Sequence, residues 1–276
     1  MRPILYAVPI GIAAGGASAF FLVLLERASA FFEQDPRLLF LLPVFAAFTA
    51  WLYLKFGGAA GKGTDLVLDR AAEPGPDIPL AMAPLVLVGT VLTHLGGGSA
   101  GREGTAVQMG GSLADAFGRD LSREERCQTI VAGIAGGFGA VFGTPLAGAA
   151  FALEAPRPLP TKGLWYGPLW RGPLLPALLA AWIAHLTCLN LGVTHTDYRS
   201  LIGERILFSL PTLLLAIGVG IAAGGASRAF VLSIYGAKRL YGKVADPIVR
   251  AAVGGIAVVA VTLVLGTRAY NGLSIP

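Results

Sequence analysis

Long segments without a charged side chain constrain this chain more than any other feature of its sequence. Seven such runs, each of at least 17 residues, follow one another along the chain. A helix of about 20 apolar residues crosses the hydrocarbon core of a bilayer. The runs therefore predict an all-α, polytopic integral membrane protein with the lipid bilayer as its surroundings. They span Pro3–Leu25, Leu38–Leu54, Ile78–Gly101, Cys127–Leu153, Gly172–Thr196, Ile206–Ser227 and Ala251–Thr267.

Composition separates this chain from soluble globular domains and indicates irregular helices. Charged residues make up 13% of the chain, against about 25% in a typical soluble domain. The 38 glycines allow helices to approach closely and to break in mid-membrane. Breaks at that depth are tolerated only where they line a cavity. We therefore expect the tilted and broken helices of a transporter rather than a single membrane anchor.

The remaining composition excludes several classes of function. The net charge of +5 does not indicate a nucleic-acid partner, because basic cytoplasmic loops of a membrane protein give the same balance. The two cysteines lie in apolar runs without metal-ligand spacing, and no nucleophile–base pair is visible. The sequence thus predicts no metal, no cofactor and no enzymatic activity. Two basic clusters are interpreted as solvated cytoplasmic loops: Arg119, Arg123 and Arg126, and Arg157, Lys162 and Arg171.

The octapeptide GIAAGGAS occurs twice, at Gly11–Ser18 and Gly220–Ser227. Corresponding elements in two halves are typical of transporters built from structural repeats, and an odd number of spans in each half favours an inverted arrangement. We expect residues 1–200 to form a first transmembrane repeat that holds the anion-site motif. Residues 201–276 would begin a second repeat that is incomplete, so that the chain is truncated at its C-terminus and does not transport alone.

The charged pair Arg102–Glu103 stands between a 24-residue uncharged run and the glycine-rich stretch Gly104–Ala114. Ionisable residues at membrane depth are functional-site candidates by default. An ordinary ion pair in a loop is the alternative. The preceding Gly96–Gly101 also fits the GxGxxG pattern of dinucleotide-binding proteins, but that pattern must follow a short strand in a soluble βαβ unit.

The glycines around Arg102 and Glu103 predict a helix that starts inside the membrane. A start at Glu103–Thr105 would leave the amides of Gly104, Thr105 and Ala106 without intrahelical acceptors. These amides and the helix dipole form an anion site. The Glu103 carboxylate can occupy the site when ionised and leave it when protonated, which is a mechanism for exchanging protons against anions.

At these residues the sequence resembles the CLC family of anion channels and antiporters. Gly101–Gly104 match the family motif, and Glu103 falls on its gating glutamate. Gly143–Gly148, with the later Glu154, resembles the second conserved helix pair. Gly61–Asp65 stands where the family has its first anion-coordinating loop. The resemblance implies a homodimer and these anion-binding residues: Arg102, Gly104, Thr105, Ala106, Gly63 and Thr64.

Departures from the usual CLC motif resemble the fluoride/proton antiporter branch. Thr105 replaces a proline, Met109 belongs to the branch motif, and no serine occupies the Gly61–Asp65 loop. Ala155 follows Glu154, where chloride-selective members often carry a second carboxylate. The resemblance implies export of fluoride coupled to proton import across a bacterial-type plasma (inner) membrane. Two alternatives remain: a chloride channel or chloride/proton antiporter of the family, and a membrane fragment that does not transport.

Other polar residues have two interpretations each. Asp65 is a candidate helix cap or a residue of the transport path. Glu154 is a candidate proton-path residue or a structural partner of Arg157 at i+3. His94 is either a proton relay or a hydrogen-bonded structural histidine. The segment Tyr270–Pro276 is predicted to break a helix of the second repeat near the proton path.

Overall fold

The computed structural model describes residues 2–156, 172–195 and 209–272. Over these ranges the chain forms α-helices and short 3₁₀ and π turns, with no strand. The all-α expectation is therefore confirmed for the described part of the chain. The basic cluster Arg157, Lys162 and Arg171 and the last residues of Tyr270–Pro276 lie outside it.

The seven apolar runs correspond to helices of very different lengths. Four helical segments are long and apolar enough to cross a membrane: Arg2–Gln34, Pro36–Ala72, Leu210–Tyr241 and Pro247–Leu265. Shorter apolar helices occupy the other runs, among them α4 (Met82–Leu95), α7 (Pro145–Glu154) and α8 (Leu174–Asn190). The ten residues of α7 reach only about 15 Å, half the hydrocarbon thickness. The prediction of broken helices is confirmed.

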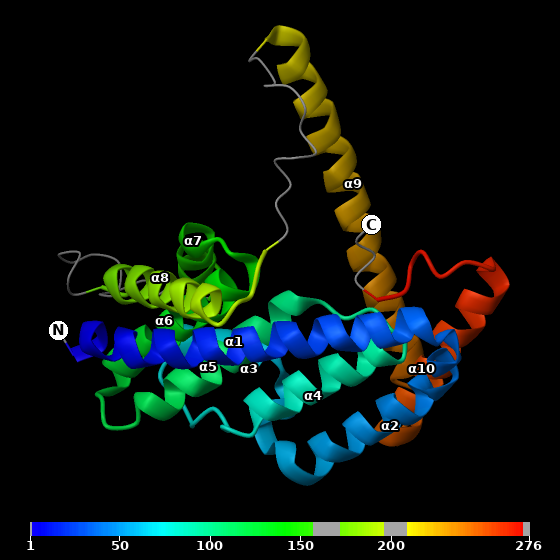
Figure 1. Ribbon diagram of the computed structural model, residues 1–276, viewed down its shortest axis with the longest axis horizontal. Coiled ribbons are helices and arrows are strands. Elements are labelled where there is room, and N and C mark those ends of the chain that lie inside the picture. The colour runs from blue at the N-terminus through cyan, green and yellow to red at the C-terminus, as the bar shows by residue number, and fades with distance from the viewer. Residues whose placement is uncertain (1, 157–171, 196–208, 273–276) are drawn as a thin grey trace.

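Helix α1 (Arg2–Gln34) lies along α8, and the first octapeptide forms part of this contact (Figure 1). A Cβ atom added to Gly11 would lie 2.8 Å from the Cβ of Ile183. One added to Gly15 would collide with the backbone of Ala184. Small residues permit such close approach in lipid, where helix association depends on packing rather than on escape from water.

Helices α5 (Arg102–Phe117) and α6 (Arg123–Phe142) lie backbone to backbone at the centre of the fold. A Cβ atom on Gly110 would collide with the carbonyl of Gly133, so glycine is required there. Helix α6 also packs against α1, α7 and α8. This packing fixes the axis of α5, the helix that begins with the Arg102–Glu103 pair.

A chain of short elements precedes α4 and brings a second helix start beside α5. Helix α2 (Leu42–Leu52) continues into a π turn at Tyr53–Gly57 and a 3₁₀ turn at Gly58–Lys62. Helix α3 (Thr64–Ala72) then packs its buried Leu66 and Val67 on α5 and α6. The earlier 3₁₀ turn at Pro36–Leu41 joins α1 to α2.

The second octapeptide has different surroundings from the first. It lies in α9 (Leu210–Tyr241), which has no buried residue and extends away from the other helices (Figure 1). Helix α10 (Pro247–Leu265) returns to the body and packs on α2, where Gly255 contacts Pro43. The division of the chain into repeats at residue 200 stays a prediction.

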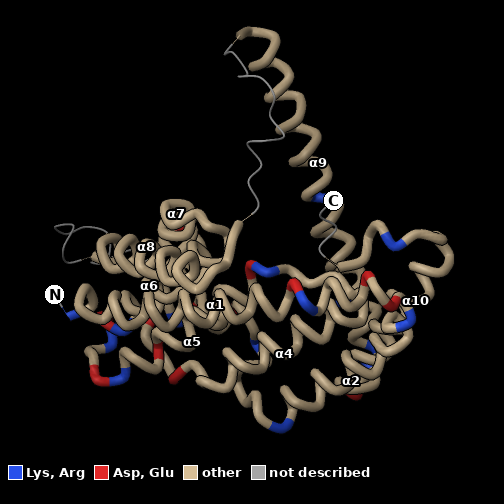
Figure 2. The backbone as a smooth tube through the Cα atoms, in the orientation of Figure 1, with Lys and Arg blue, Asp and Glu red and all other residues tan. Residues whose placement is uncertain are grey.

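The distribution of charge suits a bilayer. Charged residues lie mainly at helix ends and in connections, and long helical stretches carry none (Figure 2). Large apolar side chains are exposed along α1, α9 and α10, among them Leu5, Ile221 and Val264. Lipid tails are the natural neighbours of such surfaces.

Candidate anion-transport site

Helix α5 begins at Arg102, with Gly101 as its N-cap residue in an extended conformation. The predicted start at Glu103–Thr105 is therefore too late by one residue. The amides without intrahelical acceptors are then those of Gly101, Arg102, Glu103 and Gly104, because the fourth helical residue already bonds to the cap carbonyl. The amide of Gly104 is therefore without an intrahelical acceptor, as predicted. The amides of Thr105 and Ala106 are instead hydrogen-bonded within the helix.

Helix α3 begins at Thr64, and its N-cap is Gly63 at φ +63°. This left-handed conformation strains any residue with a Cβ atom, which explains the glycine. Asp65 was a candidate cap, but α3 has no side-chain cap and Asp65 lies in the first turn. There its charge can still interact favourably with the positive end of the helix dipole.

The starts of α3 and α5 meet. The side-chain amide nitrogen of Gln108 (Nε2) donates a 3.3 Å hydrogen bond to the Thr64 hydroxyl, across 44 residues of sequence. A Cβ atom on Gly104 would lie 3.3 Å from the same hydroxyl. Gly63, Thr64 and Gly104, named from separate sequence motifs, thus lie together at one candidate site, where two positive helix ends converge.

Gln108 is a site residue that the sequence reasoning missed. It stands in the segment after GREGT that resembles the fluoride branch, but the motif alone does not show which way the side chain points. Four residues after Gly104, it lies on the same face of α5. That spacing from the candidate anion-binding residues was the available signal.

Glu103 is exposed and its carboxylate folds back toward the cap of its own helix. A Cβ atom on Gly101 would lie 2.5 Å from Glu103 Oε2. The carboxylate therefore lies at the positive end of α5, where a negative charge is favoured. It can compete there with an anion from solution.

Arg102 is turned to a different partner. Its guanidinium carbon lies 5.6 Å from the ring centre of Phe142, a cation–π distance. Among the ion pairs of the described residues, none joins Arg102 to Glu103. The Glu103 side chain can thus move without breaking a salt bridge to its neighbour.

Two candidates from the motif region are buried. Thr105 is 2% exposed and hydrogen-bonds to Thr90 of α4, so its hydroxyl is engaged inside the protein. Met109 is 1% exposed and packs with Phe21 and Leu25 of α1. Both side chains pack α5 against its neighbouring helices α4 and α1.

The remaining candidates belong to other elements: α4, α7 and the segment after α10. Glu154 is exposed at the end of α7, and its proposed partner Arg157 is outside the described residues. His94 is buried, with Nδ1 2.9 Å from the Thr90 carbonyl oxygen and no partner for Nε2 in the described structure. Asn271 donates a 2.7 Å hydrogen bond to the Gly97 carbonyl, which ties the segment after α10 to the loop before α5.

No His, Cys, Asp and Glu cluster among the described residues has the make-up of a metal site. The chemistry available at the two helix starts is that of hydrogen-bond donors: backbone amides, a hydroxyl and a side-chain amide. Together with the exposed Glu103 carboxylate, these groups suit the binding and release of a small anion.

Comparison with known proteins identifies the family of this chain. The family described as "Voltage gated chloride channel" matches residues 44–274. A chloride/fluoride channel protein of Pseudomonas syringae pv. tomato is 37% identical over 279 residues, covering 97% of this chain and 59% of the relative. An H⁺/Cl⁻ exchange transporter of Vibrio cholerae is 45% identical over 62 residues, covering 21% of this chain and 13% of the relative.

Solved structures give the same answer for the fold. A CLC-type fluoride/proton antiporter superimposes with a TM-score of 0.86 at 34% identity, over 98% of this chain and 67% of that one. A cyanobacterial Cl⁻/H⁺ antiporter gives 0.78 at 20% identity, over 99% and 66%. The chain spans only 59% of the length of the curated Pseudomonas relative. It is a multi-pass membrane protein and belongs to the voltage-gated chloride channel (CLC) family.

Proposed function

We propose that this chain forms part of a pathway that exports fluoride in exchange for protons. The observation that carries the proposal is the meeting of the α3 and α5 starts, with the Glu103 carboxylate beside them. The likeness to a chloride/fluoride channel protein and to a fluoride/proton antiporter supports fluoride as the anion. By the same likeness, a homodimer in a bacterial inner membrane is the proposed setting.

The free amides at the start of α5 and the dipoles of both helices attract the anion. The Thr64 hydroxyl accepts a hydrogen from Gln108, so its own hydrogen can be directed to the anion. Fluoride holds its hydration shell strongly, and a site must replace those water contacts to admit it. A hydroxyl next to backbone amides supplies such contacts.

Coupling follows from competition between two anions for one place. Ionised Glu103 fills the positive helix end, and an arriving fluoride must displace it. The displaced carboxylate takes up a proton and later carries it to the other side when it returns. Fluoride that enters a cell as neutral HF becomes trapped as the anion, and inward proton flow drives it out again.

The decisive experiment measures anion efflux and proton uptake from proteoliposomes that contain this chain, alone and within the complete pathway to which it is proposed to contribute. Transport is expected in the second case only. We expect fluoride efflux to exceed chloride efflux, and Glu103→Gln to abolish proton movement driven by a fluoride gradient. Glu73→Gln, at an exposed carboxylate outside the site, serves as the control. Equal fluxes of the two anions would favour a chloride transporter, and no flux at all would favour a non-transporting fragment.

A further inference from the structure

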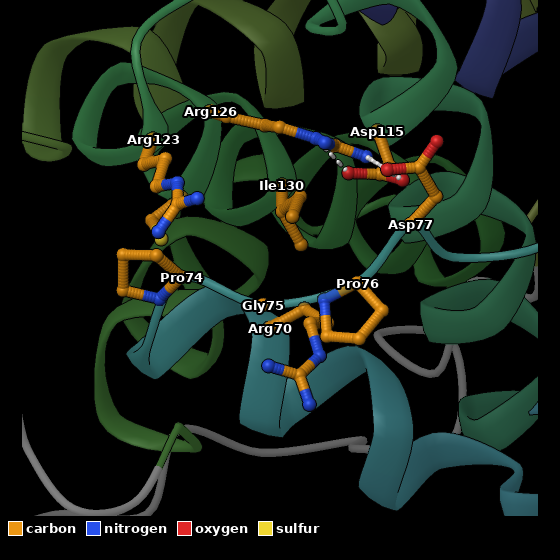
Figure 3. Close-up of a pocket in the computed structure, with 10 residues that line it drawn as sticks. Arg70, Pro74, Gly75, Pro76, Asp77, Asp115, Arg123, Arg126 and Ile130 are labelled. Atoms are coloured by element: carbon orange, nitrogen blue, oxygen red, sulfur yellow. Dashed lines mark hydrogen bonds and ion pairs between the residues drawn. The ribbon is translucent and has the colours of Figure 1, made fainter.

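Helix α5 is held in the fold at its far end by a charged network (Figure 3). Arg126 donates hydrogen bonds of 2.6 and 2.7 Å to the two carboxylate oxygens of Asp115, and one of 2.9 Å to Asp77. The Ile78 amide adds a 2.7 Å hydrogen bond to Asp115, which is 1% exposed. With the far end fixed, the path of the chain at the start of the helix depends on the segment before it, residues 96–101.

This segment, which we call the α4–α5 loop, begins with three buried glycines. Gly97 has a φ of +70°, and a Cβ atom on it would collide with the ring of Phe32 in α1. A Cβ atom on Gly96 would lie 3.0 Å from the Leu42 side chain of α2. A peptide group with glycine on both sides rotates easily unless its polar groups are held, because glycine has so many allowed conformations. The path of the loop therefore depends on its hydrogen bonds.

The peptide group between Gly97 and Gly98 is held at both of its polar ends. Its N–H, on Gly98, donates a 2.8 Å hydrogen bond to the Thr93 carbonyl of α4. Its carbonyl, on Gly97, accepts a 2.7 Å hydrogen bond from the side-chain amide of Asn271, 174 residues along the chain. A buried carbonyl oxygen without a donor costs free energy, so the Asn271 amide stabilises this one orientation of the peptide group.

The Asn271 side chain is itself oriented by a second hydrogen bond. Its amide nitrogen also donates to the Thr262 hydroxyl oxygen of α10 at 3.3 Å, and that hydroxyl donates at 2.9 Å to the Val258 carbonyl. A carbonyl oxygen only accepts, so the nitrogen of the Asn271 amide must face Gly97. The Asn271 backbone amide bonds to the Arg268 carbonyl at 2.9 Å, in the turn after α10. One side chain thus joins the end of α10 to the α4–α5 loop.

We propose that Asn271 is a positioning residue for Glu103. Gly97 stands four residues before Gly101, the N-cap of α5, and the Glu103 carboxylate folds back against Gly101. By holding the Gly97 carbonyl, Asn271 fixes the direction in which the chain reaches the cap, and with it the place of the carboxylate. It acts through the loop and not by contact with that carboxylate. The inference rests on the proposed role of Glu103 in exchanging protons against the anion.

Loss of the Asn271 donor should release the peptide group between Gly97 and Gly98. Asn271→Leu keeps the branched shape of the side chain and removes its donor without adding a charge. The Gly97 carbonyl can then turn away, and the Gly98 N–H leaves Thr93 with it, because both groups belong to one plane. The chain would reach Gly101 along more than one path, so the carboxylate would lose its single place beside the cap.

Two measurements test this inference. The first is hydrogen–deuterium exchange of this chain in detergent, read on the peptide that covers residues 96–102. We expect Asn271→Leu to speed exchange in this peptide about ten-fold or more, because local opening of the loop loses one of its restraints. The second is fluoride efflux from the complete pathway across a range of pH. The same variant should change the pH dependence of efflux, which a loss of stability alone would not do.

The matched control is Asp246→Ala, at the opposite end of α10. Asp246 caps this helix by accepting hydrogen bonds of 2.7 and 3.0 Å from the amides of Ile248 and Val249. The helix has 19 residues, so the cap lies about 27 Å from its last turn. Asp246→Ala should lower the stability of α10 and leave both the loop exchange and the pH dependence as they are.

Each outcome supports or overturns the inference. Unchanged exchange in Asn271→Leu would overturn it, because the side chain would not then hold the loop. Faster exchange with an unchanged pH dependence, or equal effects of Asp246→Ala, would leave Asn271 a structural role alone and overturn it as well. Absence of flux from the unchanged complete pathway would count against the proposed function instead, and the exchange measurement would still decide whether Asn271 holds the loop.

Discussion

The hydroxyl oxygens of Thr90 and Thr105 lie 2.8 Å apart, in a hydrogen bond between α4 and α5. Both side chains are buried, at 6% and 2% exposure. Because Thr105 stands in the first turn of α5, the bond fixes the start of that helix against its neighbour. The usual CLC motif, which this segment resembles, has a proline at the position of Thr105. Proline has no hydroxyl and would leave Thr90 without this partner.

Thr105→Val should destabilise the protein while keeping its shape. The change leaves the Thr90 hydroxyl buried without its interhelical partner, at a cost of about 1–3 kcal/mol. Thr105→Ser keeps the hydroxyl and should lose much less. Thermal unfolding in detergent measures both. In the double variant Thr90→Val/Thr105→Val the two losses should not add, and strict additivity would show that the bond contributes nothing.

Gly101→Ala should change gating without unfolding the protein. Gly101 has a φ of −70°, which alanine adopts freely, but the new Cβ atom would lie 2.5 Å from Glu103 Oε2. The carboxylate is the end of a flexible side chain, so it should rotate away from the helix cap. The pH dependence of fluoride efflux should then differ from that of the unchanged protein, which efflux measured across a range of pH would show.

The matched control is Gly218→Ala, at an exposed glycine of α9 with open space around a new Cβ atom. It should leave the pH profile as it is. An unchanged profile in Gly101→Ala would mean that the observed position of Glu103 has no part in gating.

Arg126→Gln should be strongly destabilising. The change leaves the Asp115 carboxylate buried without its cation, and the loss of one partner from a buried pair costs about 3–5 kcal/mol. Asp115→Asn/Arg126→Gln removes both charges and should recover part of that loss. Arg119→Gln is the control, because its 3.9 Å contact to Asp77 is largely exposed. Equal stability of the two arginine variants would contradict this account.

The sequence predicted those features that depend on local pattern. Uncharged runs indicated the helices, and the Gly101–Gly104 motif located a helix start with Glu103 in its first turn. The contacts that assemble the site were not predictable, because they join distant segments. Thr64 meets Gln108 across 44 residues, and Arg126 reaches Asp77 across 49. Arg126 was therefore interpreted as part of a solvated loop, although it neutralises a buried aspartate.

The two copies of the octapeptide provide a test in which local sequence is held constant. Gly15 and Gly224 occupy the same place in GIAAGGAS. A Cβ atom at Gly15 would collide with the backbone of Ala184, and backbone cannot move aside as a side chain can. At Gly224 nothing lies within 4 Å of the added atom. The same substitution should therefore have opposite consequences at the two sites.

Gly15→Ala should separate α1 from α8 and cost about 1–3 kcal/mol, as overpacking in a close-packed interior does. Gly224→Ala should be neutral or slightly stabilising, because alanine favours an exposed helix over glycine by about 1 kcal/mol. Unfolding of both variants in the same detergent gives the comparison. Equal destabilisation would mean that α9 also packs closely against a helix in solution, through a contact absent from the described structure. A neutral Gly15→Ala would instead refute the α1–α8 contact itself.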